Sequence, residues 1–463
     1  MDWLALQDRM PRDRALPERC FRLSALESVL DGRHYDVLRY PFSAERNGAG
    51  EYVPLDERRP SVRSNLCRVV VEDSVSLLFS EGHWPTIQVS DARTATALET
   101  ICQASALKQT MLEAATRGSV GSVVVLMRVV DGRIFFDVLR TAYLTPVWSS
   151  SDPRELSELI ERYRVKAEDL LAQGHAVEPG GDYWFERHWD DRVETWYLPY
   201  RDGADRKIDV ERSGEHGLGF VPAVWIRNLP ASCDMREGPD GGCTFQAAID
   251  TVIETDYLLS QAGRGLKYGS DPTLVLKDPG LGIPQGSAAH VGGASNALML
   301  PPEGDAKLLE INGNAAAAVL AHVQQLRAIA LEAMHGNRAQ SDRLGAAQSG
   351  RAIELMCQGL IWLADRLRIS YGEYGLVSLL RKICLASRRL EGGLVVGDAH
   401  VTDLDDAGLS LSWPDWFPMG PQDRQAQADA LGRLVEGGIM TQAAAERIIG
   451  RSYGISVMLG GGT

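Results

Sequence analysis

One short stretch of the chain approaches a phosphate-binding loop. Gly345–Ala352 reads G-A-A-Q-S-G-R-A, close to the pattern G-x-x-x-x-G-K-[ST]. In a working loop the lysine contacts the β- and γ-phosphates and the hydroxyl group binds Mg²⁺. Arg351 and Ala352 stand at those two positions, and the stretch follows a helix and a loop instead of a strand. We interpret Gly350 and Ala352 as small residues at a close-packed helix start, with nucleotide binding as the less favoured hypothesis.

A second glycine-rich stretch, Gly263–Gly269, reads G-R-G-L-K-Y-G. Its spacing differs by one residue from the dinucleotide-binding pattern G-x-G-x-x-G, and it ends a helical pattern where that motif begins one. The stretch therefore predicts a helix end and a chain reversal.

Carboxylate and imidazole groups gather in one aromatic, alternating stretch, at Glu186, His188, Asp190 and Asp191. Such a group can act in acid–base catalysis or hold a metal ion. On an alternating strand, however, these residues form the solvated face more simply. The chain has no H-E-x-x-H motif, and its seven cysteines lack C-x-x-C spacing. We expect no enzymatic activity, no metal and no cofactor.

A polar stretch between two helical patterns has stronger functional content. It is long for a connection between helices, which favours a function over an ordinary solvated loop. Its polar residues are Asn337, Arg338, Gln340, Ser341, Asp342 and Arg343.

The bulk composition narrows the class of protein. With 463 residues, 44% hydrophobic and 24% charged, the chain can bury a sizeable core in several regions. A net charge of −14 argues against wrapping nucleic acid through a general basic surface. The N-terminal stretch lacks the apolar region of a secretory signal, and the longest apolar run, Ala315–Ala321, is too short for a membrane span. We expect a cytoplasmic setting with reduced thiols and no membrane.

Residues 1–242 predict an α+β region. The Asp131–Gly132 pair predicts a tight hairpin turn. We expect helices at 24–38, 67–78 and 92–116, a short helix near 155–161, and strands through most of 144–228.

The second half predicts long helices around a small β tip. Thr244 is a candidate N-cap for a helix that ends near Ala262. We expect a β tip over 270–312 and helices at 314–335, 348–390, 423–436 and 441–449, with a kink or break of the longest at Gly359, Gly372 or Gly375. The tip has too few apolar residues to be stable alone, which favours a packed homo-oligomer.

The order of these parts resembles the portal proteins of tailed bacteriophages. Six stretches are similar to recurring ones of that family and together cover most of residues 55–450. They are VRSNLCRVVVEDSVSLLFSEGHWPTIQ (62–88), AATRGSVGSVVVLMRVVDGRIFFDVLRTAYLTPVW (114–148), GLGFVPAVWIRN (217–228), AAIDTVIETDYLLSQAGRGLKYGSDPTLVLKDPG (247–280), SGRAIELM (349–356) and GIMTQAAAERIIG (438–450).

The resemblance implies an α+β portal fold assembled as a ring, usually of twelve subunits. Its parts would be a wing at 1–242, an outgoing stem helix at 243–269, a clip at 270–312, a returning stem helix at 313–335, a tunnel loop at 336–348, a long kinked helix with a wing-closing strand at 349–420, and a helical crown at 421–463.

The resemblance also implies roles for individual residues. The tunnel loop would contact DNA phosphates. The stem helices would pack against neighbouring subunits through Phe245, Ile249, Val252, Ile253, Val319, Val323 and Leu326. The clip would dock partners near Asp271, Leu274, Lys277 and Asp278.

The implied function is a conduit for double-stranded DNA at one capsid vertex, for genome packaging, retention and ejection. The implied partners are the large terminase subunit, a head–tail adaptor, and the major capsid and scaffold proteins, in a virion made in the host cytoplasm. Two alternatives stay open, namely another ring-forming structural protein of a virus-like particle and an NTPase that uses Gly345–Ala352.

Overall fold

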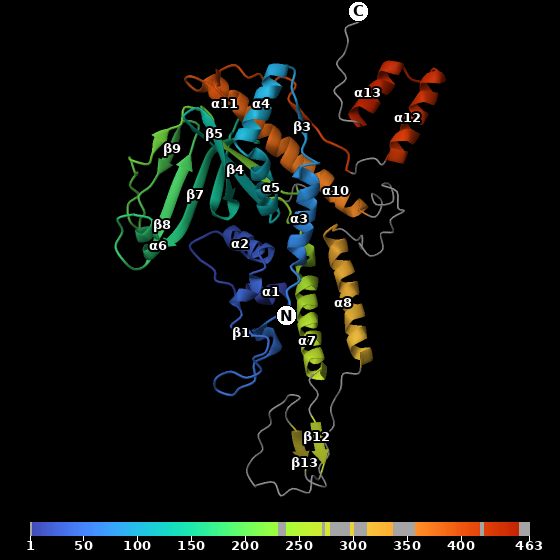
Figure 1. Cartoon of the computed structure of the whole chain (residues 1–463). Helices are drawn as coiled ribbons and strands as arrows, with labels where there is room; N and C mark the ends of the chain where they lie inside the picture. The colour runs from blue at the N-terminus through green and yellow to red at the C-terminus, as the bar shows by residue number, and fades with distance from the viewer. Residues whose placement is uncertain are drawn as a thin grey trace, which may run out of the picture.

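The architecture joins a mixed body to a long pair of helices (Figure 1). The structure, a computed structural model, describes residues 2–229, 238–270, 274–277, 297–300, 313–336, 357–416 and 421–452. Helices and strands are both abundant, which confirms the expected α+β class.

The N-terminal residues form a layer on the body. Asp2 caps the first helix, since its side chain accepts a hydrogen bond from the backbone N–H of Ala5 (2.8 Å). The helix expected at 24–38 lies earlier in the chain and begins directly after Pro17. The elements are α1 (Trp3–Gln7), α2 (Glu18–Leu30), η1 (His34–Val37), β1 (Tyr40–Pro41), η2 (Leu55–Glu57) and β2 (Arg58–Arg59).

The helix expected at 92–116 is two helices, α4 (Ala92–Ala104) and α5 (Leu107–Gly118). The chain turns at Ala106, whose φ is +51°. This turn lets both helices bury apolar side chains in the main core, which a single straight helix would not do. The preceding elements are α3 (Leu66–Phe79), as expected, and β3 (Thr86–Gln88).

A three-stranded antiparallel sheet lies at the centre of the body, with β4 (Ser122–Val130) between β5 (Arg133–Arg140) and β11 (Ala223–Arg227). The expected hairpin is confirmed, because Asp131 and Gly132 have φ values of +50° and +73° between β4 and β5. Both faces of β4 are buried, which explains its continuous apolar run.

A five-stranded antiparallel sheet packs beside the first. The short helix expected near 155–161 is wrong, because these residues belong to a strand held between two neighbours, and tertiary pairing overrides the local pattern. The helix here is α6 (Ala167–Ala172). The strands, in sheet order, are β10 (Gly214–Glu215), β9 (Val193–Trp196), β8 (Asp182–Trp189), β7 (Leu156–Lys166) and β6 (Leu144–Trp148).

Two long helices lie side by side and extend from the body to a small parallel strand pair (Figure 1). The outgoing helix begins at Ile249, after the short η4 (Gln246–Ala248), and not at Thr244 as expected. It also continues through Gly263 and Gly265, because packing against its neighbour outweighs the helix cost of about 1 kcal/mol per glycine. The elements are α7 (Ile249–Ser270), β12 (Leu274–Lys277), β13 (Ala297–Leu300) and α8 (Gly313–Ala333).

The long helix expected at 348–390 is described from Gln358 onward, and its kink takes the form of a π-helical segment. Gly372 lies in that segment against Trp413, where an added Cβ would come within 2.5 Å of the ring. A Cβ added at Gly375 would lie 2.8 Å from the Ile226 side chain. The elements are α10 (Gln358–Leu367), the π-helical η6 (Arg368–Leu376), α11 (Val377–Arg389), β14 (Leu394–Val396), β15 (Ala399–Val401) and β16 (Ser410–Ser412).

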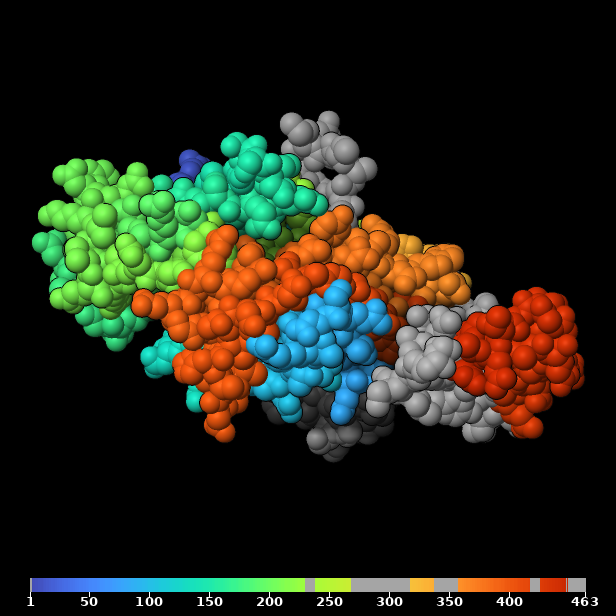
Figure 2. Space-filling model, turned by 90° about the horizontal axis from the view of Figure 1, so that it is seen from above, coloured from blue at the N-terminus to red at the C-terminus, as the bar shows by residue number. Residues whose placement is uncertain are grey.

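The last two helices, α12 (Pro421–Glu436) and α13 (Gln442–Ser452), confirm the two expected near the C-terminus. Figure 2 shows them (red) at the opposite end of the molecule from the five-stranded sheet (green). The orange segment between these ends lies against the light-blue segment, in agreement with the pairing of β16 with β3.

Candidate functional site

The junction between the body and α7 is built on a buried amide. Asn228, just after β11, is fully buried and donates from Nδ2 to the Gly242 carbonyl (2.7 Å) and to Thr244 Oγ1 (3.0 Å). The Tyr371 hydroxyl, from the π-helical segment, donates to Asn228 Oδ1 (3.0 Å). One side chain thus joins the central sheet, the segment that leads into α7 and the long helix. Thr244, the expected N-cap, contacts this amide, and the helical residues begin after Phe245.

A second set of buried polar contacts joins α7 to the N-terminal layer. Asp256 is almost fully buried, and its carboxylate accepts from the Ser64 backbone N–H (2.8 Å) and from the Tyr35 hydroxyl (3.1 Å). Burial raises the pKa of Asp256, and these hydrogen bonds oppose the rise only in part. One turn further along α7, Ser260 Oγ accepts from the Val62 N–H (3.0 Å). Residues in the range 2–64 thus hold α7 against the body.

The residues expected to pack α7 against neighbouring subunits are enclosed by the chain itself. Their exposed fractions are at most 3%, and all four lie in the main core. They leave no apolar surface for a neighbour, so any contact between subunits along α7 must use other positions. These residues are Phe245, Ile249, Val252 and Ile253.

On α8 the expected packing residues face α7 in part. Val323 is 9% exposed, and Val319 and Leu326 are half-buried. The outer surface of the pair carries different apolar side chains, which the sequence stripe did not identify. Leu320 on α8 is 48% exposed, Ile329 on α8 is 55% exposed, and Leu266 on α7 is 54% exposed.

The other predicted site residues lie in or beside segments outside the described residues. Leu274 and Lys277 are the first and last residues of β12. Asp271, Asp278 and the polar loop residues Asn337, Arg338, Gln340, Ser341, Asp342 and Arg343 lie outside the described part of the chain, as does Gly345–Ala352.

The group at 186–191 is not the solvated strand face that the alternation predicts. Glu186 is 1% exposed, because the segment after β9 folds over this face and brings Arg206 to the carboxylate (2.8 Å). His188 Nε2 lies 2.9 Å from Glu186, and its Nδ1 lies 2.8 Å from Glu158 Oε1. Asp190 instead accepts backbone hydrogen bonds in the turn between β8 and β9.

The titration of this group follows from its partners. Burial alone would raise the pKa of Glu186, but hydrogen bonds from His188, Tyr200 and Arg206 outweigh it and lower that pKa to about 2. The same contact with Glu186, with help from Glu158, raises the pKa of His188. Both carboxylate oxygens of Glu186 have partners within the chain. Glu186 therefore acts as a buried anion that holds the surrounding segments together.

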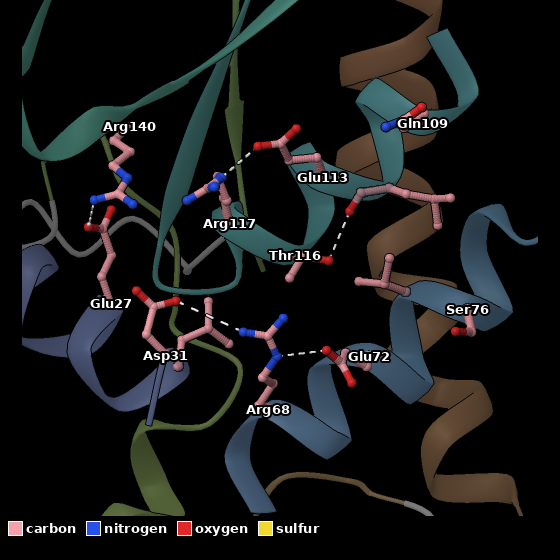
Figure 3. A pocket seen from close by; sticks show the side chains of 13 residues that line it. Glu27, Asp31, Arg68, Glu72, Ser76, Gln109, Glu113, Thr116, Arg117 and Arg140 are labelled. Atoms are coloured by element: carbon pink, nitrogen blue, oxygen red, sulfur yellow. Dashed lines mark hydrogen bonds and ion pairs between the residues drawn. The ribbon is translucent and has the colours of Figure 1, made fainter. Parts of the chain in front are cut away.

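A polar cleft of about 560 Å³ lies between α2, α3, α5 and β5 (Figure 3). Its charged side chains neutralise one another in pairs across and along its walls. No histidine or cysteine lines it. The pairs are Arg68 with Glu72 (2.7 Å), Arg117 with Glu113 (2.8 Å) and Arg140 with Glu27 (3.5 Å).

Within the part of the chain described, no three histidine, cysteine, aspartate or glutamate side chains are grouped to hold a metal ion. Among the helices described, none combines the length and the apolar character that crossing a bilayer requires. Neither the protein-family models nor the curated proteins compared with this chain give a match.

Proposed function

We propose that this chain is the subunit of a ring-shaped DNA conduit of the portal type, placed at one vertex of a capsid. The α7–α8 pair carries the proposal. It leaves the body as two adjacent helices, ends in the two-stranded β12–β13 pair, and has apolar side chains on its outside. A two-stranded sheet is marginal on its own in water, so this arm needs neighbours.

Neighbouring copies would supply that cover. Burial of apolar surface is favourable by about 25 cal/mol per Å², so the half-exposed Leu320, Ile329 and Leu266 favour a contact between arms. A contact between two different faces of the same chain, repeated by a rotation that divides a full turn, closes into a ring. Twelve subunits is the number that the portal resemblance implies.

The charge suits a channel through which DNA slides. A chain with a net charge of −14 repels the phosphate backbone, so DNA in the bore would be confined without adsorbing. In this proposal Arg338 and Arg343 of the tunnel loop make the few phosphate contacts, independently of base sequence. The clip, near Leu274 and Lys277, docks the terminase during packaging and the head–tail adaptor afterwards, while the wing meets capsid and scaffold proteins.

Ring formation is tested on the purified full chain by negative-stain microscopy and mass photometry. We expect rings with an axial channel for the wild type. Replacement of Leu320 and Ile329 by aspartate should shift the mass toward single subunits, because charge would enter the contact between arms. A matched control replaces Ile208 and Val210, which are 53% and 81% exposed on the body, by aspartate and should leave rings intact. A wild type that stays monomeric at high concentration contradicts the proposal.

The DNA contact is tested separately. The double variant Arg338→Ala with Arg343→Ala should form normal rings but package or retain less DNA. Full yields of filled heads from that variant contradict the contact while leaving the ring proposal intact.

A further inference from the structure

A second cleft, of about 540 Å³, lies where the segment before α2 meets the five-stranded sheet and β11. One wall is β6, which has a partner strand on one side only. Most of the lining side chains, those of β6 included, are apolar or aromatic. They include Leu16, Pro17, Tyr143, Pro146, Trp148 and Trp184.

The charge of this cleft is opposite to that of the chain. Among the residues that the structure describes, no acidic side chain lines the cleft, while three arginines do. Arg19 is already engaged, since it donates to Asp240 from Nε (2.7 Å) and from Nη2 (2.6 Å). Arg162 is partly engaged, 3.5 Å from Glu186. Arg227 is exposed, and within the described residues its guanidinium has no ion-pair partner.

Aromatic rings hold the two less engaged guanidinium groups. Arg162 lies over the Trp184 ring (4.1 Å from Cζ to the centroid), and Arg227 lies over the Trp148 ring (5.5 Å). A stacked guanidinium keeps its N–H groups at its edge, where they match the two oxygens of a carboxylate. The cleft therefore combines carboxylate recognition with an apolar surface beside it.

We propose that this cleft binds an acidic, extended peptide segment of a partner protein. A carboxylate of the peptide would pair with Arg227, and an adjacent apolar side chain would pack against Trp148 and Pro146. Nucleic acid fits less well, because strand binding needs a row of cations along the backbone and this cleft has one unpaired arginine between apolar walls. None of the lining residues belongs to α7 or α8, on which the ring proposal rests, so different variants test the two proposals.

The test uses fluorescence anisotropy with the full chain and a fluorescein-labelled nine-residue peptide that alternates aspartate or glutamate with leucine and tryptophan. Two further probes serve as comparisons. The first is the same peptide with asparagine and glutamine in place of the acidic residues, and the second is a labelled nine-nucleotide thymidine strand, which is also negatively charged. We expect the acidic peptide to bind at least about tenfold more tightly than either, since a charge-assisted bidentate contact separates them. Hydrogen exchange should slow in Leu144–Trp148 when the peptide binds.

Arg227→Glu should weaken binding of the acidic peptide about tenfold or more, with unchanged circular dichroism and melting temperature. The matched control is Arg39→Glu, the same charge reversal at an exposed arginine that lies over Tyr40 outside the cleft, and it should bind as the wild type does. Equal affinity of Arg227→Glu and wild type, or tighter binding of the thymidine strand, overturns the proposal. Self-association that Arg227→Glu abolishes would assign the cleft to a second copy of the chain and would also overturn it.

Discussion

The buried amide at the root of α7 makes a prediction with a defined magnitude. Tyr371→Phe removes one hydroxyl and leaves Asn228 Oδ1 without its donor, which should lower the free energy of unfolding by about 1–2 kcal/mol. Asn228→Ala removes the partner of four groups, on Ser119, Gly242, Thr244 and Tyr371, and should cost about 3–5 kcal/mol. Both residues are fully buried, so water cannot replace the lost contacts.

The double variant decides whether the contact exists. In Asn228→Ala the Tyr371 hydroxyl is buried without a partner, so its removal in the double variant should add little, and the two losses should fall short of additivity by about 1 kcal/mol. Urea denaturation at one protein concentration measures all four variants, with Tyr143→Phe as the control for a half-buried tyrosine outside this junction. Losses that add within about 0.3 kcal/mol would refute the shared hydrogen bond.

Three other perturbations follow from the contacts described. Gly118→Ala should destabilise by about 1–3 kcal/mol, because the new Cβ would meet the Tyr371 hydroxyl at 2.2 Å, and Tyr371→Phe should relieve part of that loss. The raised pKa of His188 stabilises the fold at low pH, so stability should decline as the pH rises above 6.5, and His188→Gln should flatten that decline. Asp240→Ala leaves the largely buried guanidinium of Arg19 without its carboxylate and should lower the free energy of unfolding by about 3 kcal/mol. Arg22 is more exposed, so Arg22→Ala should lower it by less than about 1 kcal/mol.

Each of these predictions has a contrary result. If the stability losses of Gly118→Ala and Tyr371→Phe simply add in the double variant, as measured by thermal melts, the clash with the Tyr371 hydroxyl is relieved by movement of the backbone and not of the tyrosine ring. A pH profile that is the same with and without His188 would show that its contacts with Glu186 and Glu158 do not contribute to the stability of the five-stranded sheet. Equal losses of unfolding free energy for Asp240→Ala and Arg22→Ala in urea denaturation would show that Arg22, and not Arg19, is the main partner of the Asp240 carboxylate.

Local patterns predicted elements whose chemistry is local. The Asp131–Gly132 turn requires two left-handed residues, and the sequence supplies the pair that favours them. The helix at 66–79 and the two near the C-terminus follow from apolar spacing. The strand at 156–166 could not be predicted in this way, because leucine and isoleucine there suit a helix as well as a strand. Pairing with the neighbouring strand β8, which comes later in the chain, makes this segment a strand.

The candidate site was less predictable, because its decisive contacts join residues far apart in the chain. An apolar stripe on α7 identifies a buried face but does not say whether this chain or a neighbour covers it. Glu186 looked solvated because alternation cannot show that Tyr200 and Arg206 fold back over the strand. One signal was present in the sequence: an aspartate at position 256, inside an apolar stripe, indicates a buried polar anchor of the kind formed with Tyr35 and Ser64.

The distribution of polar contacts separates the two helices of the arm. Buried hydrogen bonds tie α7 to the body at Asp256 and Ser260, and through its preceding segment at Asn228. Such contacts fix one geometry, because a displaced partner would leave a buried group unsatisfied. On α8 the apolar side chains outside the pair, Leu320 and Ile329, are half exposed. In the proposed ring, α7 would therefore set the direction of the arm relative to its own body, and α8 would supply the surface that meets the next subunit. A ring that tolerates aspartate at Leu320 and Ile329 but fails with Asn228→Ala would reverse that division.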